Sequence, residues 1–241
     1  MVKKVKGMKK IVLFAMGLVA SATAMAQDEI ETTMGVDLVN QYIWRGQDLG
    51  NVSLQPTLGV SYKGLSLSAW GSVGLTDSND TKEFDLTLGY TIDGFNISIT
   101  DYWFNTGLDP ANRYFKYDAH GTNHVFEANV GYDFGVASVQ WYTNFAGNDG
   151  ANKNGKRAYS SYFEANVPFR LGGAEWTATA GAVPYATTSY GTTGFAVTNL
   201  SLKATKDIKV TDSFSIPIFA QVAANPCSQC AYLVLGFTLQ P

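Results

Sequence analysis

The stretch Glu83–Ile92, EFDLTLGYTI, alternates apolar and polar side chains with a period of two. Phe84, Leu86, Leu88, Tyr90 and Ile92 share one parity, and the residues between them begin with Glu, Asp and Thr. Successive side chains of a β-strand point to opposite faces, so this pattern predicts a strand with one apolar and one polar face.

The same alternation recurs along the chain after Met34, and helical periodicity is not convincing anywhere. The first of these segments places Asp37, Gln41 and Arg45 on its polar parity. The predicted strands occupy 34–44, 54–62, 65–75, 84–92, 95–103, 126–134, 139–145, 159–169, 176–182, 195–204, 214–222 and 233–239. About twelve strands, with ten as the alternative, give the even number that bacterial single-chain barrels have.

Connection lengths give a second signal, because outer-membrane barrels have short turns at one end and longer loops at the other. Short turns are predicted at Lys63-Gly64, Asp93-Gly94, Gly135 and Leu171-Gly172-Gly173. The connections between them are longer and polar, and they lie at 46–53, 76–81, 105–121, 146–156 and 185–194. Lys206–Ser213 is long for a turn and breaks the pattern.

The fold class predicted is therefore all-β, a single antiparallel transmembrane β-barrel. The alternative is a soluble β-sandwich whose apolar faces point into a core. Strands of about ten residues and the two connection lengths favour the barrel. So do aromatic residues near predicted strand ends, which would form interfacial girdles: Tyr42, Trp44, Trp103, Phe145 and Phe169.

The N-terminus predicts export. Five lysines precede the apolar run Ile11–Ala20, and Ala24-Met25-Ala26 follows, which is the layout of a signal peptide over 1–26 with a barrel domain over 27–241. Removing those five lysines from the 17 basic residues leaves 12 against 20 acidic ones, a formal net charge of −8. This charge argues against a nucleic-acid partner. No cofactor and no metal site are predicted.

The segment Val39-Asn40-Gln41-Tyr42-Ile43-Trp44-Arg45-Gly46 carries a small polar residue, any residue, Tyr, two residues and Arg-Gly. It resembles the opening signature of the TorF-type family, conserved hypothetical outer-membrane proteins classed as porins. The alternation in Leu233–Leu239 also looks like a terminal strand recognised by the outer-membrane assembly machinery. The resemblance implies location in the outer membrane, contact with its lipid, and transport of small solutes.

If the apolar parity faces lipid, charged residues point into the lumen. The predicted lumen-lining residues are Asp37, Arg45, Glu83, Asp85, Asp101, Glu127, Asp133 and Glu164. One interpretation is a water-filled pore with a weak preference for cations, passing small cationic or neutral solutes. The other is a plugged lumen in which Arg45 and the carboxylates neutralise one another and Trp70, Tyr102 and Tyr162 fill space.

Other chemistry finds little support in the sequence. His120 and His124 are the two histidines. His124 is followed by Val125 and Phe126 and lacks the hydroxyl that a His-x-Ser hydrolase site needs, so we predict no catalysis and a solvated loop for both histidines. Cys227 and Cys230, in an exported chain, predict a small disulfide. The function predicted is a porin; the alternatives are a non-conducting structural or adhesive, surface-binding barrel and, less favoured, a hydrolase at the rim.

Overall fold

The computed structural model describes residues 30–105, 113–119, 121–212 and 214–241. Within these residues, twelve antiparallel strands close into a single barrel. The predicted twelve-strand barrel is confirmed, and the ten-strand alternative is wrong. The predicted signal peptide, residues 1–26, lies outside the described residues.

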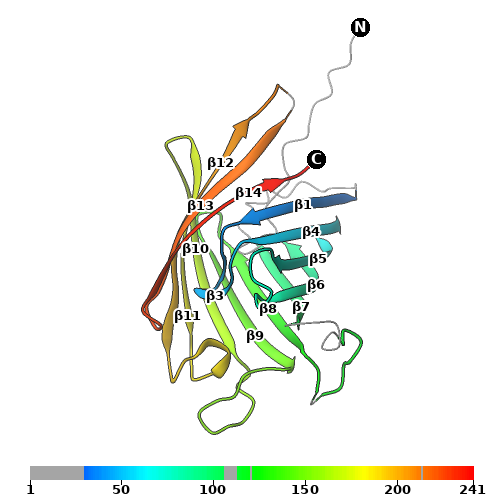
Figure 1. Ribbon diagram of the computed structural model, residues 1–241, viewed down its shortest axis with the longest axis vertical. Coiled ribbons are helices and arrows are strands. Elements are labelled where there is room, and N and C mark those ends of the chain that lie inside the picture. The colour runs from blue at the N-terminus through cyan, green and yellow to red at the C-terminus, as the bar shows by residue number, and fades with distance from the viewer. Residues whose placement is uncertain (1–29, 106–112, 120, 213) are drawn as a thin grey trace.

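The wall runs in chain order around the barrel (Figure 1), except that a short hairpin interrupts it between the first two wall strands. The wall strands are 9 to 14 residues long, and about 9–11 residues suffice to cross a bilayer at a tilt. They are β1 (Glu31–Val39), β4 (Ser53–Tyr62), β5 (Leu65–Gly74), β6 (Lys82–Ile92), β7 (Phe95–Asn105), β8 (His124–Asp133), β9 (Ser138–Gly147), β10 (Ser161–Leu171), β11 (Ala174–Val183), β12 (Ala196–Lys209), β13 (Ser215–Asn225) and β14 (Cys230–Leu239). The hairpin consists of β2 (Tyr42–Trp44) and β3 (Gln47–Gly50), and a single 3-10 turn, η2 (Thr188–Tyr190), lies between β11 and β12.

None of the described residues belongs to a helix that is long and apolar enough to span a membrane.

The outer surface of the wall is apolar. Leu58 on β4 and Leu88 on β6 are 56% and 53% exposed, while the alternate residues, such as Ser66, line the interior. A contiguous apolar surface around a whole protein is incompatible with water and suits the hydrocarbon of a membrane. The β-sandwich alternative is wrong, because it would bury these side chains between two sheets.

The two connection lengths separate to opposite ends of the barrel. Figure 1 shows the long β9–β10 and β11–β12 connections at the end far from the start of β1 and the end of β14. At the near end, Lys63-Gly64 has φ of 47° and 83°, and Asp93-Gly94 has 48° and 83°. Positive φ at both central residues is the type I′ geometry of a two-residue hairpin. We call the end with the two-residue turns the turn end, and the end with the long connections the loop end.

The predicted exception to this rule, Lys206–Ser213, is corrected by the structure. Lys206–Lys209 continue β12 and pair with Ser215–Ile218 of β13, so the turn begins only at Val210. The polar residues of this stretch belong to a long hairpin rather than to a long loop.

The barrel closes through a short seam between β1 and β14. Only Val36–Val39 pair with Gly236–Leu239, which is four residue pairs, whereas β1 and β4 share nine. Asp37 supports the seam, since it accepts a hydrogen bond of 2.6 Å from the Thr238 hydroxyl.

Candidate functional site

The β2–β3 hairpin leaves the wall and enters the lumen at its loop end. Val39 of β1 and Ser53 of β4 are already paired across the wall, so the residues between them form an insertion. Arg45 and Gly46, with φ of 50° and 78°, form its two-residue turn. The predicted first strand, 34–44, is therefore corrected: it divides at Asn40 into a wall strand and one arm of this hairpin.

Asn40 fixes the point where the chain leaves the wall. Its side-chain Nδ2 donates to the Leu233 carbonyl at 3.0 Å, and its Oδ1 accepts from the Leu235 amide at 2.6 Å. The Asn40 backbone amide also donates to the Leu235 carbonyl at 3.0 Å. Together these bonds satisfy backbone groups of β14 at the point where the chain turns inward.

The aromatic residues of the hairpin face the interior. Tyr42 is 3% exposed and donates to Glu83 Oε2 at 2.8 Å, and Ile43 packs against Val39 and Ala223 of the wall. The prediction that Tyr42 and Trp44 belong to an interfacial girdle is wrong. The alternation that places Leu38 on the outer face does not continue past Asn40, because the chain changes direction there.

Arg45 holds the hairpin to the opposite wall. Its Nη1 and Nη2 donate to the two carboxylate oxygens of Glu127 at 2.7 and 2.9 Å, and Nη1 also donates to the Tyr190 hydroxyl at 2.7 Å. The guanidinium lies 3.9 Å from the ring centroid of Tyr142 and 4.7 Å from that of Tyr162. A bidentate pair enclosed by aromatic faces is among the strong ways to fix an arginine.

Gly46 seats the tip of the hairpin against β12 and β13. The Asn225 side chain donates to the Gly46 carbonyl at 3.0 Å, and a Cβ on Gly46 would lie 1.8 Å from the Thr198 carbonyl oxygen. The backbone approach is thus closer than any other residue type allows.

Substituting Gly46 with alanine is expected to lower the free energy of unfolding by about 2–5 kcal/mol, since the left-handed φ and the clash with Thr198 both oppose the methyl group. Urea titration of the folded barrel in detergent measures this. Gly135→Ala is the matched control, because Gly135 has a φ of 83° and nothing within 4 Å of its Cβ position. The control should lose about 1–2 kcal/mol; equal losses would argue against a clash at the hairpin tip.

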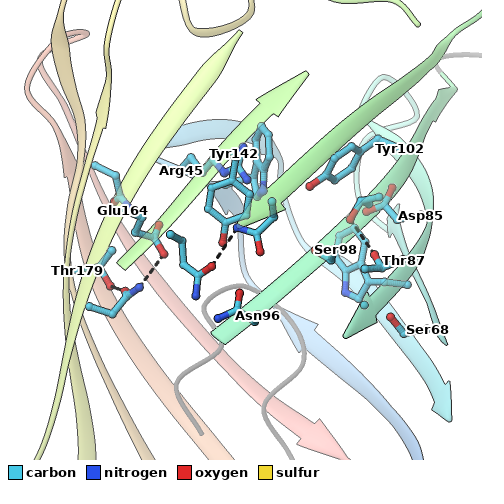
Figure 2. A pocket seen from close by; sticks show the side chains of 18 of the residues that line it. Arg45, Ser68, Asp85, Thr87, Asn96, Ser98, Tyr102, Tyr142, Glu164 and Thr179 are labelled. Carbon is cyan, nitrogen blue, oxygen red and sulfur yellow. Dashed lines mark hydrogen bonds between the residues drawn. The ribbon is translucent and has the colours of Figure 1, made fainter. Parts of the chain in front are cut away.

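Between the hairpin and the turn end, the lumen contains a cavity of about 270 Å³. Its wall toward the turn end consists largely of short hydroxyl and amide side chains, including Ser68, Thr87, Asn96 and Ser98. Figure 2 shows Tyr102 and Asp85 on one side of it and Glu164 and Thr179 on the other. Such a surface is wettable and can exchange hydrogen bonds with water or a polar solute.

At the loop end, in contrast, the interior is packed. Tyr162 is fully buried, its ring stacks on Tyr190 with centroids 5.8 Å apart, and its hydroxyl donates to Glu164 at 2.9 Å. The lumen therefore has two unlike halves: a polar cavity toward the turn end, and a plug of hairpin and aromatic rings toward the loop end.

The structure places the predicted lumen residues as follows. Asp37, Glu83, Asp85, Glu127 and Glu164 point inward from the wall, and Arg45 points inward from the hairpin. Asp133 lies at the turn end, where it accepts a hydrogen bond from the Gly135 amide at 2.7 Å. Asp101 is corrected: it shares the outward parity of Ile97 and Ile99, while its neighbour Tyr102 faces the lumen.

Asp101 pairs instead with His124 on the outer face, near the loop end. His124 Nδ1 lies 2.7 Å from Asp101 Oδ1, and Nε2 lies 2.6 Å from the Tyr114 carbonyl oxygen. His124 is fully buried under Tyr117, whose ring stacks on it at 4.1 Å. The predicted solvated position is wrong for His124, and His120 lies outside the described residues.

This pair has the first two members of a hydrolase triad but a different arrangement. Both ring nitrogens of His124 face oxygen acceptors, so neither is free to take a proton from a hydroxyl nucleophile. The arrangement fastens the segment 113–119 to the outer wall.

Replacing His124 with alanine is expected to release this segment, because Asp101 and the Tyr114 carbonyl lose a buried hydrogen-bonding partner. Trypsin cleavage after Arg113 and Lys116 should become faster by about tenfold or more. The masses of the fragments identify the sites of cleavage. Asp118→Ala is the control, since its ion pair with Lys116 is exposed and contributes little. Unchanged cleavage in the His124 variant would show that the pair does not hold the segment.

The two cysteines lie at the loop end, Cys227 in the β13–β14 connection and Cys230 at the start of β14. Both are exposed free thiols, and Cys230 Sγ lies 3.5 Å from the Ser228 carbonyl oxygen. The predicted disulfide between Cys227 and Cys230 is therefore not formed in this structure.

Several residues that hold the hairpin were not singled out from the sequence, namely Tyr142, Tyr190 and Asn225. They come from three separate parts of the chain, and each is ordinary in its local pattern. The one local signal is Arg45-Gly46, since glycine inside an alternating stretch marks a turn or a close backbone approach.

Comparison with known proteins gives a family and a fold neighbour. A family model described as "Bacterial protein of unknown function (Gcw_chp)" matches residues 23–224. No curated protein matches the chain. Among solved structures, a triple mutant of the Rh. blastica porin aligns over 88% of this chain and 99% of that chain, with 8% identity and a TM-score of 0.35.

Proposed function

The chain belongs to the Gcw_chp family of bacterial proteins of unknown function, and from its barrel we propose that it is an outer-membrane porin that passes small solutes through a lumen narrowed by the β2–β3 hairpin, with a weak preference for cations. The observation that carries the proposal is the cavity of about 270 Å³, polar toward the turn end, which leads up to the hairpin. A barrel that served only as an anchor would have no need of such a cavity.

The charges of the lumen support the preference for cations. Arg45 is already neutralised by Glu127, whereas Glu83 and Asp85 form no salt bridge with any cation in the described part of the chain. Carboxylates on the wall of a narrow pore attract cations and repel anions. The resemblance of Val39–Gly46 to the TorF-type proteins supports the porin assignment.

A non-conducting barrel is the second candidate, and the packing at the loop end favours it. The bidentate Arg45–Glu127 pair and the fully buried Tyr162 leave little free cross-section there. In that case the barrel would serve as an anchor or a surface-binding protein. A hydrolase at the rim is not favoured, because His124 offers no free ring nitrogen.

Single-channel recording separates these functions. Protein extracted in detergent from outer-membrane fractions is inserted into a planar bilayer, and the reversal potential is measured under a KCl gradient. We expect small, stable steps with a reversal potential on the cation-selective side, which shifts toward zero in Glu83→Gln/Asp85→Asn. Folded protein that produces no steps would overturn the channel and leave the anchoring or surface-binding barrel.

A further inference from the structure

We propose that the lumen holds a binding site for a small organic cation, an amino alcohol whose ammonium group lies against Glu83 and Asp85 beside Trp70. This inference rests on the proposed function, because it names a solute class for the same cavity.

The site is built from three neighbouring wall strands. Trp70 of β5 pairs in register with Asp85 of β6, and Asp85 pairs with Tyr102 of β7. Directly paired residues have Cβ atoms about 4.5–5.5 Å apart, so an aromatic side chain flanks the carboxylate on each side. All three residues line the cavity.

The hairpin completes the site from inside the lumen. The ring of Tyr42 lies 5.6 Å from that of Trp70, and its hydroxyl donates to Glu83, which shares the inward face of β6 with Asp85. Two carboxylates enclosed by Tyr42, Trp70 and Tyr102 have the composition of sites that recognise ammonium groups, in which ring faces and anions both attract the cation.

Among the described residues, no basic side chain pairs with these two acidic groups. Glu83 and Asp85 are each 7% exposed, and no salt bridge joins either to a Lys, Arg or His within the residues the structure describes. Buried carboxylates without a counter-charge are costly. A bound cation would offset that cost.

Two buried polar atoms at the site also have no partner. Asp85 Oδ1 accepts no hydrogen bond and Trp70 Nε1 donates none, although both residues line the cavity. An ammonium group can donate to Asp85 Oδ1, and an oxygen atom can accept from Trp70 Nε1. A small molecule with a primary ammonium and a hydroxyl supplies both, and a cavity of about 270 Å³ has room for it.

Ethanolamine is the probe, and ethylene glycol is its neutral counterpart with a hydroxyl in place of the ammonium group. The readout is the indole ¹⁵N–¹H signal of Trp70 in the detergent-folded full chain; the protein has five tryptophans, and Trp70→Phe assigns the signal. We expect ethanolamine to shift it saturably and ethylene glycol at equal concentration to leave it in place. Asp85→Asn and Glu83→Gln should each weaken binding by about tenfold or more.

Asp37→Asn is the matched control, since it removes one lumen carboxylate that does not line the cavity and that already accepts a hydrogen bond from Thr238. Binding in this variant should change less than about threefold. Folding of each variant is checked by heat-modifiable gel migration, and Glu83→Gln serves if Asp85→Asn does not fold.

Absence of a saturable shift, or equal weakening in the control, would overturn the site. The two proposals fail separately. Conductance without ethanolamine binding removes the site alone, whereas binding without conductance removes the channel and leaves a barrel that binds amines.

Discussion

Arg45→Met is expected to lower the free energy of unfolding of the barrel by about 3–5 kcal/mol. The methionine cannot pair with Glu127, and it leaves a carboxylate that is only 4% exposed without a counter-charge. The hydroxyl of Tyr190 loses its partner as well. Because Arg45 is the turn residue of the hairpin, the loss also frees the hairpin tip from β8. Urea titration in detergent micelles measures the change.

The double variant Arg45→Met/Glu127→Leu tests the cause. Replacing both members of a buried ion pair with apolar residues of similar volume is often neutral or stabilising. We therefore expect the double variant to recover most of the stability that Arg45→Met loses. A double variant as unstable as the single one would mean that Arg45 acts through its contacts with Tyr142 and Tyr162 rather than through the charge of Glu127.

Removing the hairpin is expected to produce the largest functional change. Val39 and Ser53 are paired, so residues 40–52 can be replaced by Asn-Gly, which closes two adjacent strands in a type I′ turn. Glu127→Gln is included because Arg45 is deleted with the hairpin. We expect single-channel conductance to rise several-fold, since the loop half of the lumen loses the element that enters it.

Arg45→Met/Glu127→Gln with the hairpin intact is the control for the loss of the ion pair. Its conductance should rise less than that of the shortened variant, because Tyr42 and Gly46 still hold the hairpin in the lumen. Cation preference should persist in the shortened variant, because Glu83 and Asp85 are retained on β6. Equal conductance with and without the hairpin would show that ions do not pass beside it.

The strands could be predicted because their signal is local. Alternation such as that of Glu83–Ile92 reports the two faces of a strand wherever one face meets lipid. Five of the lumen carboxylates followed directly from it. Asp101 was wrongly predicted to line the lumen, although its spacing from Ile97 and Ile99 places it on the outer face. Its partner His124 comes from another strand, and no local pattern shows that pairing.

The hairpin could not be predicted, because alternation continues through the point where the chain leaves the wall. The residues that resemble the TorF-type signature turn out to be the ones that build it: Asn40 bonds to β14 where the chain leaves the wall, Tyr42 reaches Glu83, and Arg45-Gly46 make the turn. Their partners lie on β6, β8, β13 and β14, far away in sequence. A turn of this kind is local, but the direction it takes depends on tertiary contacts.

The short seam between β1 and β14 has a consequence for the speed of folding. Every other wall pairing joins strands that follow one another in the wall, so each hairpin can form from nearby residues, whereas the seam brings together Asp37 and Thr238, 201 positions apart. Contacts between residues so distant carry the greatest loop-closure entropy and slow folding the most. Only the interactions of four residue pairs compensate for the entropy that is lost when this loop closes. We therefore expect closure of the seam to be the final and rate-limiting event, preceded by an open sheet with two unpaired edges.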